Sequence, residues 1–432
     1  MDRPVPRVVW LAVAIGVIAR LVFGLGYWVD KPLTHDEREY LLLARNVASG
    51  RGFVYLLPDG SQAPGEHFGR APFYPLFLAG VIRVSQAAGI DAAAGPLEGD
   101  VARPAVLRAI RTSQAALGGL LVWLVGWMAG RAAGSRAAAT AAWLAALYPP
   151  LVWTPAYVFS ETLYAVVALG CAAVLNMAAH RIVTPAEGDR GRVPDRGSVW
   201  LYAASGILAG LAVLTRPAML FFLVLAGPWV WWTRGVRPAA VFAIAAVLAV
   251  APWSVYNTRT AGRFVPIASE GGITFWTGNH AMAIGEGDLA ANPDLKRANL
   301  ELRARHPGLS PEQLESIYYR EAWRFIRDHP VWWAWLLVRK LFYTIVPIGP
   351  SYRLHSRLYL WSSVASYLGV LPFALAGFAR LVRTRRVPMS LLLLAAGSVL
   401  ASVVFLPQER FRIPVVDPAL LVMASALRAR RV

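Results

Sequence analysis

The sequence predicts an all-α polytopic membrane protein, and three observations support this fold class. Hydrophobic residues make up 57% of the 432 positions and charged residues only 16%, whereas soluble domains hold about 45–50% and about 25%. The mean hydropathy is +0.47. Apolar stretches of roughly 20 residues, the length that crosses about 30 Å of hydrocarbon, recur along the chain. This composition excludes a disordered chain and argues against a soluble globular domain.

The charge balance indicates that the anionic partner is a membrane surface and not nucleic acid. The chain has 43 Lys and Arg against 25 Asp and Glu, a net charge of +18. A basic protein can attract either polyanion, but the high apolar content favours anionic lipid. The single cysteine, Cys171, excludes an intrachain disulfide and a multi-cysteine metal cluster.

The apolar stretches predict ten membrane spans. Their approximate ranges are 8–29, 112–130, 137–150, 158–179, 199–216, 218–233, 238–255, 358–379, 388–406 and 411–428. The first is not expected to be a cleaved signal peptide, because no small-residue cleavage site precedes the polar exit at Asp30. Two further stretches, 73–92 and 331–348, could either span the membrane or lie along its surface.

Arginine placement favours a surface position for both of these stretches, because short cytoplasmic loops concentrate Lys and Arg. With the N-terminus inside, the loops after the second, fourth and sixth spans are cytoplasmic, and they carry Arg131, Arg136, Arg181, Arg190, Arg192, Arg196, Arg234 and Arg237. If both stretches crossed the membrane, these cations would lie outside. We therefore expect one integral membrane domain, 1–432, with both termini cytoplasmic and two external segments, 30–111 and 256–357, that hold interfacial helices.

The first external segment is predicted to open with a helix that starts at Thr34. Thr34 and Glu37 have the spacing of a capping box. Asp36 heads an apolar stripe at helical spacing, so we expect it to meet a lipid head group at the membrane rim. Both carboxylates could instead serve only the positive end of the helix dipole. The stripe consists of Tyr40, Leu43, Ala44 and Val47.

A short apolar helix is predicted after Pro72, with Arg70 just before it and Tyr74 inside it. Arginine beside a helix N-terminus suits a phosphate, since both offer directed N–H donors. Snorkelling at the membrane edge is the alternative. The pair Glu66-His67 offers two kinds of metal ligand without a third, so no metal site is predicted.

Two charged residues near the short external turns have a structural and a functional interpretation. Arg216 is the only cation in those turns, and it is either a helix-end anchor or a phosphate ligand. Glu161 is either a dipole partner at the start of its helix or an orienting residue.

The second external segment is predicted to form helices that cover such a site. Ser310 and Gln313 form a capping box with proline at the first helical position. Trp332, Trp333 and Trp335 precede Arg339 and Lys340, which is typical of an interfacial helix. We favour a membrane belt for these tryptophans over stacking with a sugar.

A series of short motifs follows in order along nearly the whole chain: Asp36-Glu37 with Tyr40 and Ala44, Gly50-Arg51-Gly52-Phe53, Arg70-Ala71-Pro72-Phe73-Tyr74-Pro75, Tyr148-Pro149-Pro150, Ser160-Glu161-Thr162-Leu163, Leu214-Thr215-Arg216-Pro217, Trp276-Thr277-Gly278-Asn279 and Glu409-Arg410-Phe411-Arg412-Ile413-Pro414. The set resembles the dolichyl-phosphate-mannose protein mannosyltransferases (glycosyltransferase family 39) and their bacterial relatives, the lipid A aminoarabinose transferases. These enzymes have the GT-C fold.

The resemblance implies a glycosyltransferase that moves a sugar from a polyprenyl-phosphate-linked donor to a hydroxyl by inverting displacement. It implies Asp36 as general base, with Glu37 beside it as the second catalytic candidate. The substrate-binding residues that it implies are Glu66, Arg70, Tyr74, Glu161, Arg216, Asn279, Arg410 and Arg412. No cofactor is expected, and a divalent cation has no support in the sequence.

The expected setting is the outer face of the cytoplasmic (inner) membrane, with protein, lipid A or a polysaccharide as the acceptor. Three alternatives stay open. A lipid-linked saccharide flippase or other transporter should show a two-fold repeat and a polar bundle interior, and neither is visible in the sequence. A noncatalytic envelope-assembly subunit would tolerate loss of Asp36 and Arg70. An O-antigen-ligase type of enzyme would use a diphosphate donor.

Overall fold

The computed structural model describes residues 6–29, 31–63, 67–89, 97–98, 101–102, 104–180, 196–287, 289–349 and 356–429. The regular secondary structure of the described residues is helical apart from a short antiparallel pair, β1 (Leu97–Glu98) and β2 (Val101–Ala102), and one isolated bridge between Leu56 and Gln62. The prediction of an all-α polytopic fold is confirmed.

Five described helices are long and apolar enough to cross a membrane. They are α1 (Arg7–Val22) with its π-helical continuation η1 (Phe23–Tyr27), α4 (Pro104–Ala133), α7 (Glu161–His180), α10 (Val236–Ala261) and α15 (Arg357–Arg383). Shorter helices occupy the other predicted spans: α5 (Ser135–Leu147), α8 (Arg196–Val213), α9 (Leu220–Arg234), α16 (Met389–Val404) and α18 (Val416–Ser425). The count of ten spans stays a prediction.

Prolines and backbone geometry explain where the observed helices differ from the predicted spans. The helix predicted at 137–150 ends at Leu147, and a separate short helix, α6 (Pro149–Trp153), follows. The last predicted span is broken into α17 (Glu409–Arg412) and α18, with Pro414 between them, because proline lacks the N–H that a continuous helix needs. In contrast, α4 is longer than the span predicted at 112–130, because the helix already starts at Pro104.

Small residues allow the helices of the bundle to approach one another closely. A Cβ on Gly126 of α4 would lie 3.0 Å from the Ala142 Cβ of α5. On α8, a Cβ at Gly210 would lie 2.6 Å from Ala249 of α10, and one at Gly206 would overlap the Phe242 carbonyl oxygen. Because lipid is as apolar as leucine, such close packing is what holds helices together in a membrane.

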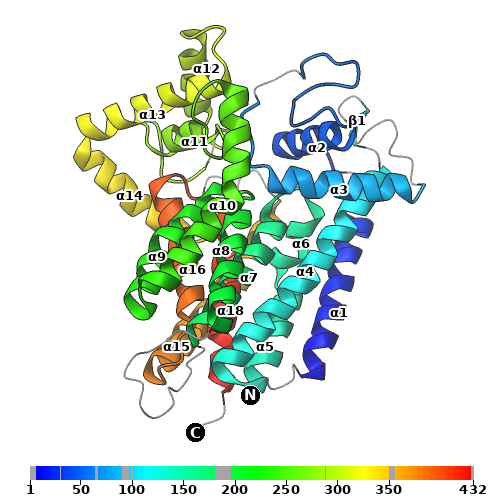
Figure 1. Ribbon diagram of the computed structural model, residues 1–432, viewed down its shortest axis with the longest axis vertical. Helices are drawn as coiled ribbons and strands as arrows, with labels where there is room; N and C mark the ends of the chain where they lie inside the picture. The colour runs from blue at the N-terminus through cyan, green and yellow to red at the C-terminus, as the bar shows by residue number, and fades with distance from the viewer. Residues whose placement is uncertain are drawn as a thin grey trace.

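The remaining helices gather at one end of the bundle, opposite the start of α1 and the C-terminal turn η5 (Ala426–Arg428) (Figure 1). They include α2 (His35–Ala48), α3 (Phe73–Ala87), α11 (Gly271–Gly278), α12 (Pro293–Ala304), α13 (Pro311–Asp328) and α14 (Pro330–Ile345). Two 3-10 turns lie between helices of the bundle: η2 (Thr154–Ala156) precedes α7, and η3 (Pro217–Met219) joins α8 to α9. In Figure 1, α3 lies across the end of the bundle.

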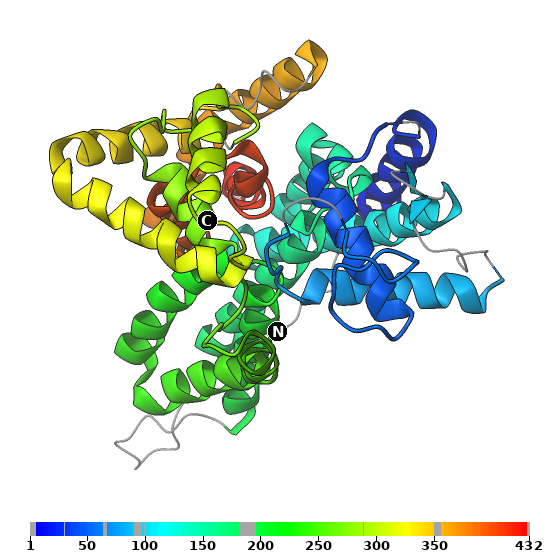
Figure 2. The ribbon, with the colours of Figure 1, turned by 90° about the horizontal axis from the view of Figure 1, so that it is seen from above.

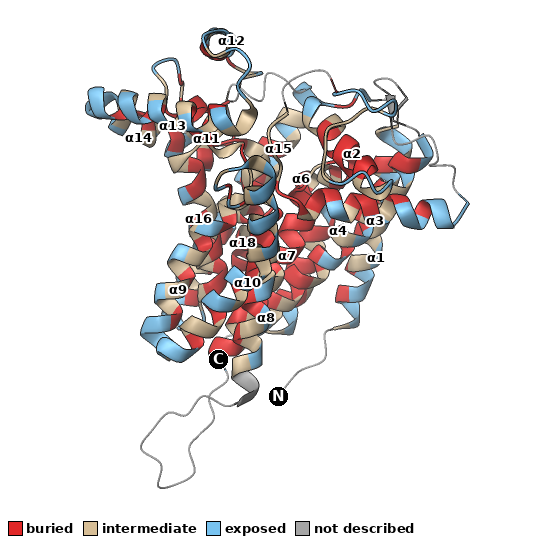
Figure 3. Cartoon of the chain, turned by 45° about the horizontal axis from the view of Figure 1, so that its top comes forward, coloured by how far each residue is buried: buried red, intermediate tan, exposed pale blue. Residues whose placement is uncertain are grey.

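Neither of the two ambiguous stretches forms one of the candidate spans among the described residues. Seen from above, α13 and α14 meet in a V that reaches outward from the bundle (Figure 2). Buried residues concentrate inside the bundle, while the outer ends of α3 and of the V are exposed (Figure 3).

Both predicted capping boxes are confirmed. The Thr34 hydroxyl accepts from the Glu37 amide while the Glu37 side chain accepts from the Thr34 amide, and Ser310 and Gln313 do the same at α13. Each box satisfies two amides at a helix start. The first box fixes the orientation of α2, the helix that carries Asp36.

Candidate active site

Two loops from distant parts of the chain pair beside α2 and create the centre of the site. The Gly69 amide donates to Ser269 Oγ at 2.8 Å, and the Ser269 amide donates to the Gly69 carbonyl at 3.0 Å. This pairing joins the two segments, 30–111 and 256–357, that the sequence predicts to be external. As a result, Arg70 and Glu270, the next residues of the two loops, lie side by side.

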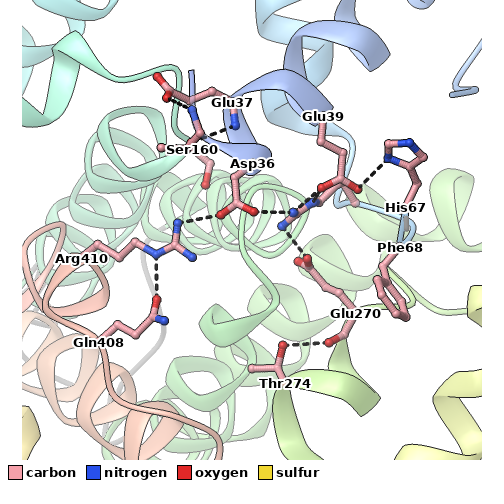
Figure 4. Close-up of polar contacts among 12 residues, drawn as sticks. Asp36, Glu37, Glu39, His67, Phe68, Ser160, Glu270, Thr274, Gln408 and Arg410 are labelled. Carbon is pink, nitrogen blue, oxygen red and sulfur yellow. Dashed lines mark hydrogen bonds and ion pairs between the residues drawn. The ribbon is translucent and has the colours of Figure 1, made fainter. Parts of the chain in front are cut away.

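Arg70 binds three carboxylates at once. Figure 4 labels these carboxylates as Asp36, Glu39 and Glu270. Arg70 Nη2 donates to Asp36 Oδ1 at 2.9 Å, and its Nη1 donates to Glu270 Oε2 at 2.6 Å. Its Nε donates to Glu39 Oε2 at 2.7 Å, and Nη2 makes a second contact with the same oxygen. All three guanidinium nitrogens are therefore engaged by protein oxygens.

The second oxygen of Asp36 is bound by Arg410. Arg410 Nη1 donates to Asp36 Oδ2 at 2.7 Å, and its Nε donates to Gln408 Oε1 at 2.8 Å. The side chains of Asp36 and Arg410 are 23% and 34% exposed, in contrast to 2% for Glu39. Glu270 is 27% exposed, so solvent or a substrate can reach Asp36, Arg410 and Glu270, whereas Glu39 is enclosed.

The same cluster shifts the pKa values of two carboxyl groups in opposite directions. Burial would raise the pKa of Asp36, but the charges and hydrogen bonds of Arg70 and Arg410 outweigh it and hold this pKa well below its usual range. Burial raises the pKa of Glu270, with Glu39 and Asp36 adding to it, and Arg70 only partly offsets the effect. Asp36 is therefore ionised at neutral pH.

Two tyrosines back the cluster. The Arg70 guanidinium lies 5.2 Å from the ring centroid of Tyr40, and burial raises the pKa of Tyr40 to about 12. Tyr74 packs edge-on against Tyr40 and donates from its hydroxyl to Gln114 Oε1 at 3.0 Å. Tyr74 is fully buried, so it supports the site from behind Tyr40.

Arg216 and Glu161 form an ion pair next to Arg410. Arg216 Nη1 lies 2.7 Å from Glu161 Oε1 and 3.4 Å from Ser160 Oγ. The Phe411 ring contacts both arginines, with its centroid 4.6 Å from Arg216 and 5.3 Å from Arg410. Arg216 and Arg410 are therefore neighbours through one aromatic ring.

Glu37, the second catalytic candidate, accepts hydrogen bonds from two backbone amides and makes none with the Asp36 cluster among the described contacts. Its Oε2 accepts from the Thr34 amide at 2.8 Å, and its Oε1 accepts from the Val158 amide at 2.9 Å. It is 2% exposed, and burial raises its pKa. These contacts fasten the start of α2 to the segment before α7.

Two other candidates also make internal contacts away from Asp36. Arg412 forms an ion pair with Asp417 at 2.8 Å, and both side chains are buried. Asn279 hydrogen bonds to side chains of α14 and to the backbone at the end of α16. Glu66 lies outside the described residues.

The sequence motifs single out neither Glu39 nor Glu270, the two other acidic members of the cluster. The spacing of Glu39 is a weak sequence indication, because a residue three positions after Asp36 on the same helix lies on the same helix face. Glu270 had none, because its loop reaches Arg70 only through the tertiary pairing with Gly69. Among the described residues, no group of three or more metal-binding side chains lies in position to hold a metal ion.

A groove in the described structure lies away from this cluster. It has a volume of about 890 Å³ and runs between α3 and α4, lined mainly by apolar residues such as Phe77 and Val81. No residue of the Asp36 cluster lines it.

No protein-family model matches this chain, and no curated protein sequence matches it. Solved structures do. The oligosaccharyltransferase AglB from Archaeoglobus fulgidus, in complex with an inhibitory peptide and a dolichol-phosphate, is 15% identical with a TM-score of 0.54, and the match covers 98% of this chain and 50% of AglB. An Archaeoglobus fulgidus oligosaccharyltransferase tethered to an acceptor peptide by a disulfide bond is 16% identical with a TM-score of 0.53, over 98% of this chain and 49% of that enzyme.

ArnT from Cupriavidus metallidurans bound to undecaprenyl phosphate is 16% identical with a TM-score of 0.43, over 98% of this chain and 78% of ArnT. This chain spans about half the length of AglB. At such low identity the likeness to AglB shows the fold alone. The chain is a helical membrane protein with the GT-C fold, as the sequence motifs predicted.

Proposed function

We propose that this protein is a glycosyltransferase that moves a sugar from a polyprenyl-phosphate-linked donor to a hydroxyl acceptor at the outer face of the cytoplasmic membrane. The observation that carries the proposal is the ionised, partly exposed Asp36 held between Arg70 and Arg410 at one end of the bundle. The GT-C fold and the dolichol-phosphate in the AglB structure support it.

Asp36 is the general base in this proposal. Its carboxylate accepts a hydrogen bond from the acceptor hydroxyl and takes the proton as the oxygen bonds to the anomeric carbon. The bond between that carbon and the phosphate oxygen breaks, and the electron pair leaves with the phosphate. Because phosphate is a good leaving group, no carboxylic acid has to protonate it, unlike in a glycosidase. A single displacement inverts the anomeric configuration.

We assign the donor phosphate to Arg216 and Arg410 and not to Arg70. The three nitrogens of Arg70 are engaged by Asp36, Glu39 and Glu270, so its role is to hold the carboxylates. Among the described contacts, Nε and Nη2 of Arg216 donate no hydrogen bond. Two guanidinium groups around Phe411 offer the donors and the charge that stabilise a leaving phosphate.

The test is transfer activity in membranes that contain the full chain, with polyprenyl-phosphate mannose and polyprenyl-phosphate arabinose as probes. Mass spectrometry of envelope glycans and glycoproteins from a deletion strain identifies the acceptor among protein, lipid A and polysaccharide. Asp36→Asn is expected to lower the transfer rate by at least about 100-fold. Wild-type transfer by this variant would contradict the assignment of the base.

Asp59→Asn is the matched control. Asp59 lies in the same external segment, is exposed, and accepts hydrogen bonds only from Ser61 among the described contacts. We expect it to transfer sugar at the wild-type rate. Equal loss in both variants would indicate a general effect of removing an external carboxylate.

A further inference from the structure

A fully buried lysine lies behind the site, where the ends of α11 and α16 meet α14. Lys340 of α14 is 0% exposed. Its Nζ donates to Asn279 Oδ1 at 2.9 Å and contacts the Val404 carbonyl oxygen at 3.4 Å. Among the described contacts, no carboxylate pairs with it. All of its polar partners are therefore neutral oxygens at the ends of two other helices.

Asn279 uses its whole side-chain amide at this junction. Its Nδ2 donates to the carbonyl oxygens of Phe275 and Val404, at 2.8 Å and 3.0 Å. Its Oδ1 accepts from Trp333 Nε1 at 2.9 Å as well as from Lys340. An amide has two donors and one acceptor oxygen with two lone pairs, so its hydrogen-bonding capacity is filled. Asn279 thus ties α11, α14 and α16 together.

The backbones of α11 and α16 also touch at this point. A Cβ on Gly278 would overlap the Phe405 carbonyl oxygen, so a larger residue does not fit without a shift of the backbone. The ring of Phe275 packs 5.5 Å from that of Phe405. The junction of Lys340, Asn279 and Val404 therefore fixes the end of α11 directly against the end of α16.

Both helices lead from this junction to the catalytic cluster. Glu270 is the N-cap residue of α11, and Asn279 is its C-cap residue. On the other side, the chain runs from Val404 through Gln408 to Arg410. Glu270 binds Arg70, and Arg410 binds Asp36, which also binds Arg70. The contacts form a closed ring, and the Lys340 junction lies opposite Arg70 within it.

We propose that Lys340 is a positioning residue of the active site. Through Asn279 and the Val404 carbonyl, it sets the separation between Glu270 and Arg410, and thereby the orientation of Asp36. An apolar side chain of similar length would fill the same space without the cost of desolvating an amine. The contribution of Lys340 therefore lies in its directed hydrogen bonds and not in the stability of the fold. The activity part of this inference rests on the proposed function.

Lys340→Met tests the inference in the full chain. Methionine keeps the length and removes the donors, while Asn279 retains its contacts with Trp333, Phe275 and Val404. We expect kcat to fall about tenfold, because small displacements of catalytic groups are costly. The KM for the donor should stay within about twofold, and the midpoint of thermal unfolding should not fall. Leu336→Met, a fully buried position one turn earlier on α14, is the matched control and should retain kcat.

Two further measurements separate a positioning role from a merely structural one. In a double-mutant cycle, Lys340→Met should add little to the loss of kcat caused by Asn279→Ala, since both remove the same tie. Hydrogen exchange should become faster at 271–279 and 404–412 in Lys340→Met and stay unchanged in Leu336→Met. Wild-type kcat in Lys340→Met, or a parallel loss of unfolding midpoint and activity, would overturn the proposal.

The exchange measurement also keeps the two proposals apart, because it needs no substrate. If the wild-type chain transfers no sugar but exchange rises at these two segments in Lys340→Met, the proposed function fails and the junction stands. If the wild-type chain is active and neither exchange nor kcat changes in the variant, the junction fails alone.

Discussion

Asp36 and Glu270, which lie far apart in the sequence, bind the same guanidinium. Arg70 donates to Asp36 at 2.9 Å and to Glu270 at 2.6 Å. The pKa of Asp36 is held low by its two arginines, whereas burial raises the pKa of Glu270. Two carboxylates that share one guanidinium thus have pKa values shifted in opposite directions by their other surroundings. Arg70 is therefore the residue on which the charge balance of the site depends.

Replacement of Arg70 should damage stability as well as activity. Arg70→Met leaves Asp36, Glu39 and Glu270 close together without their shared cation, and the loss of one partner from a buried ion pair costs about 3–5 kcal/mol. We expect a lower midpoint of thermal unfolding in detergent. Arg83→Met on α3 is the control, because Arg83 is exposed and contacts only backbone carbonyls among the described contacts. A midpoint equal to that of the control would count against the role of Arg70.

Arg216 should act on donor binding. Because Arg216→Gln alone would leave the buried Glu161 unpaired, the informative variant is Arg216→Gln combined with Glu161→Gln. A hydrogen bond to a charged group contributes about 1.5–3 kcal/mol, so we expect the KM for the lipid-linked donor to rise roughly tenfold or more. Steady-state kinetics with varied donor measures this. An unchanged KM would remove Arg216 from the phosphate site.

Gly278 should not tolerate a side chain. A methyl group at this position meets the Phe405 carbonyl oxygen, so Gly278→Ala must displace α11 or α16. We expect a clear drop in the unfolding midpoint. Gly227→Ala in α9 is the matched control, because nothing lies within 4 Å of its added Cβ and alanine favours a helix interior by about 1 kcal/mol. Equal midpoints in the two variants would show that the contact is not tight.

Lys340 should make stability depend on pH. Burial lowers its pKa from 10.5 to about 7. Between these pH values the unfolded chain keeps a proton that the folded chain has lost, so the free energy of unfolding should rise with pH across this window. Below about pH 7 both states are protonated, and the cost of the buried charge is fully present. Unfolding midpoints of the wild-type chain at pH 7 and pH 9 measure the rise.

Lys340→Met supplies the comparison for this pH dependence. The variant has no amine to titrate, so the part of the slope that Lys340 contributes should disappear. It should also be at least as stable as the wild-type chain at pH 7, where much of the desolvation cost of the wild-type amine is still present. A slope equal to that of the wild-type chain would assign the pH dependence to other groups.

The sequence by itself determined the fold class and the local signals within it. Hydropathy predicted a helical membrane bundle, and residue spacing predicted the capping boxes at Thr34 and Ser310, both of which the structure contains. Short motifs identified the GT-C fold and singled out Asp36, Arg70, Arg216 and Arg410. These features depend on neighbouring residues in the chain, so a linear pattern is enough to reveal them.

Only the tertiary structure decided how these residues are used. Glu270 joins Arg70 because two loops 200 positions apart pair with each other, and no local pattern encodes such a pairing. In the same way, the sequence predicts substrate contacts for Arg70 and Asn279, but only the fold places three carboxylates around Arg70 and joins Asn279 to Lys340. Which charges neutralise one another depends on long-range packing, because ion pairs form between whichever groups the folded bundle brings within a few ångströms.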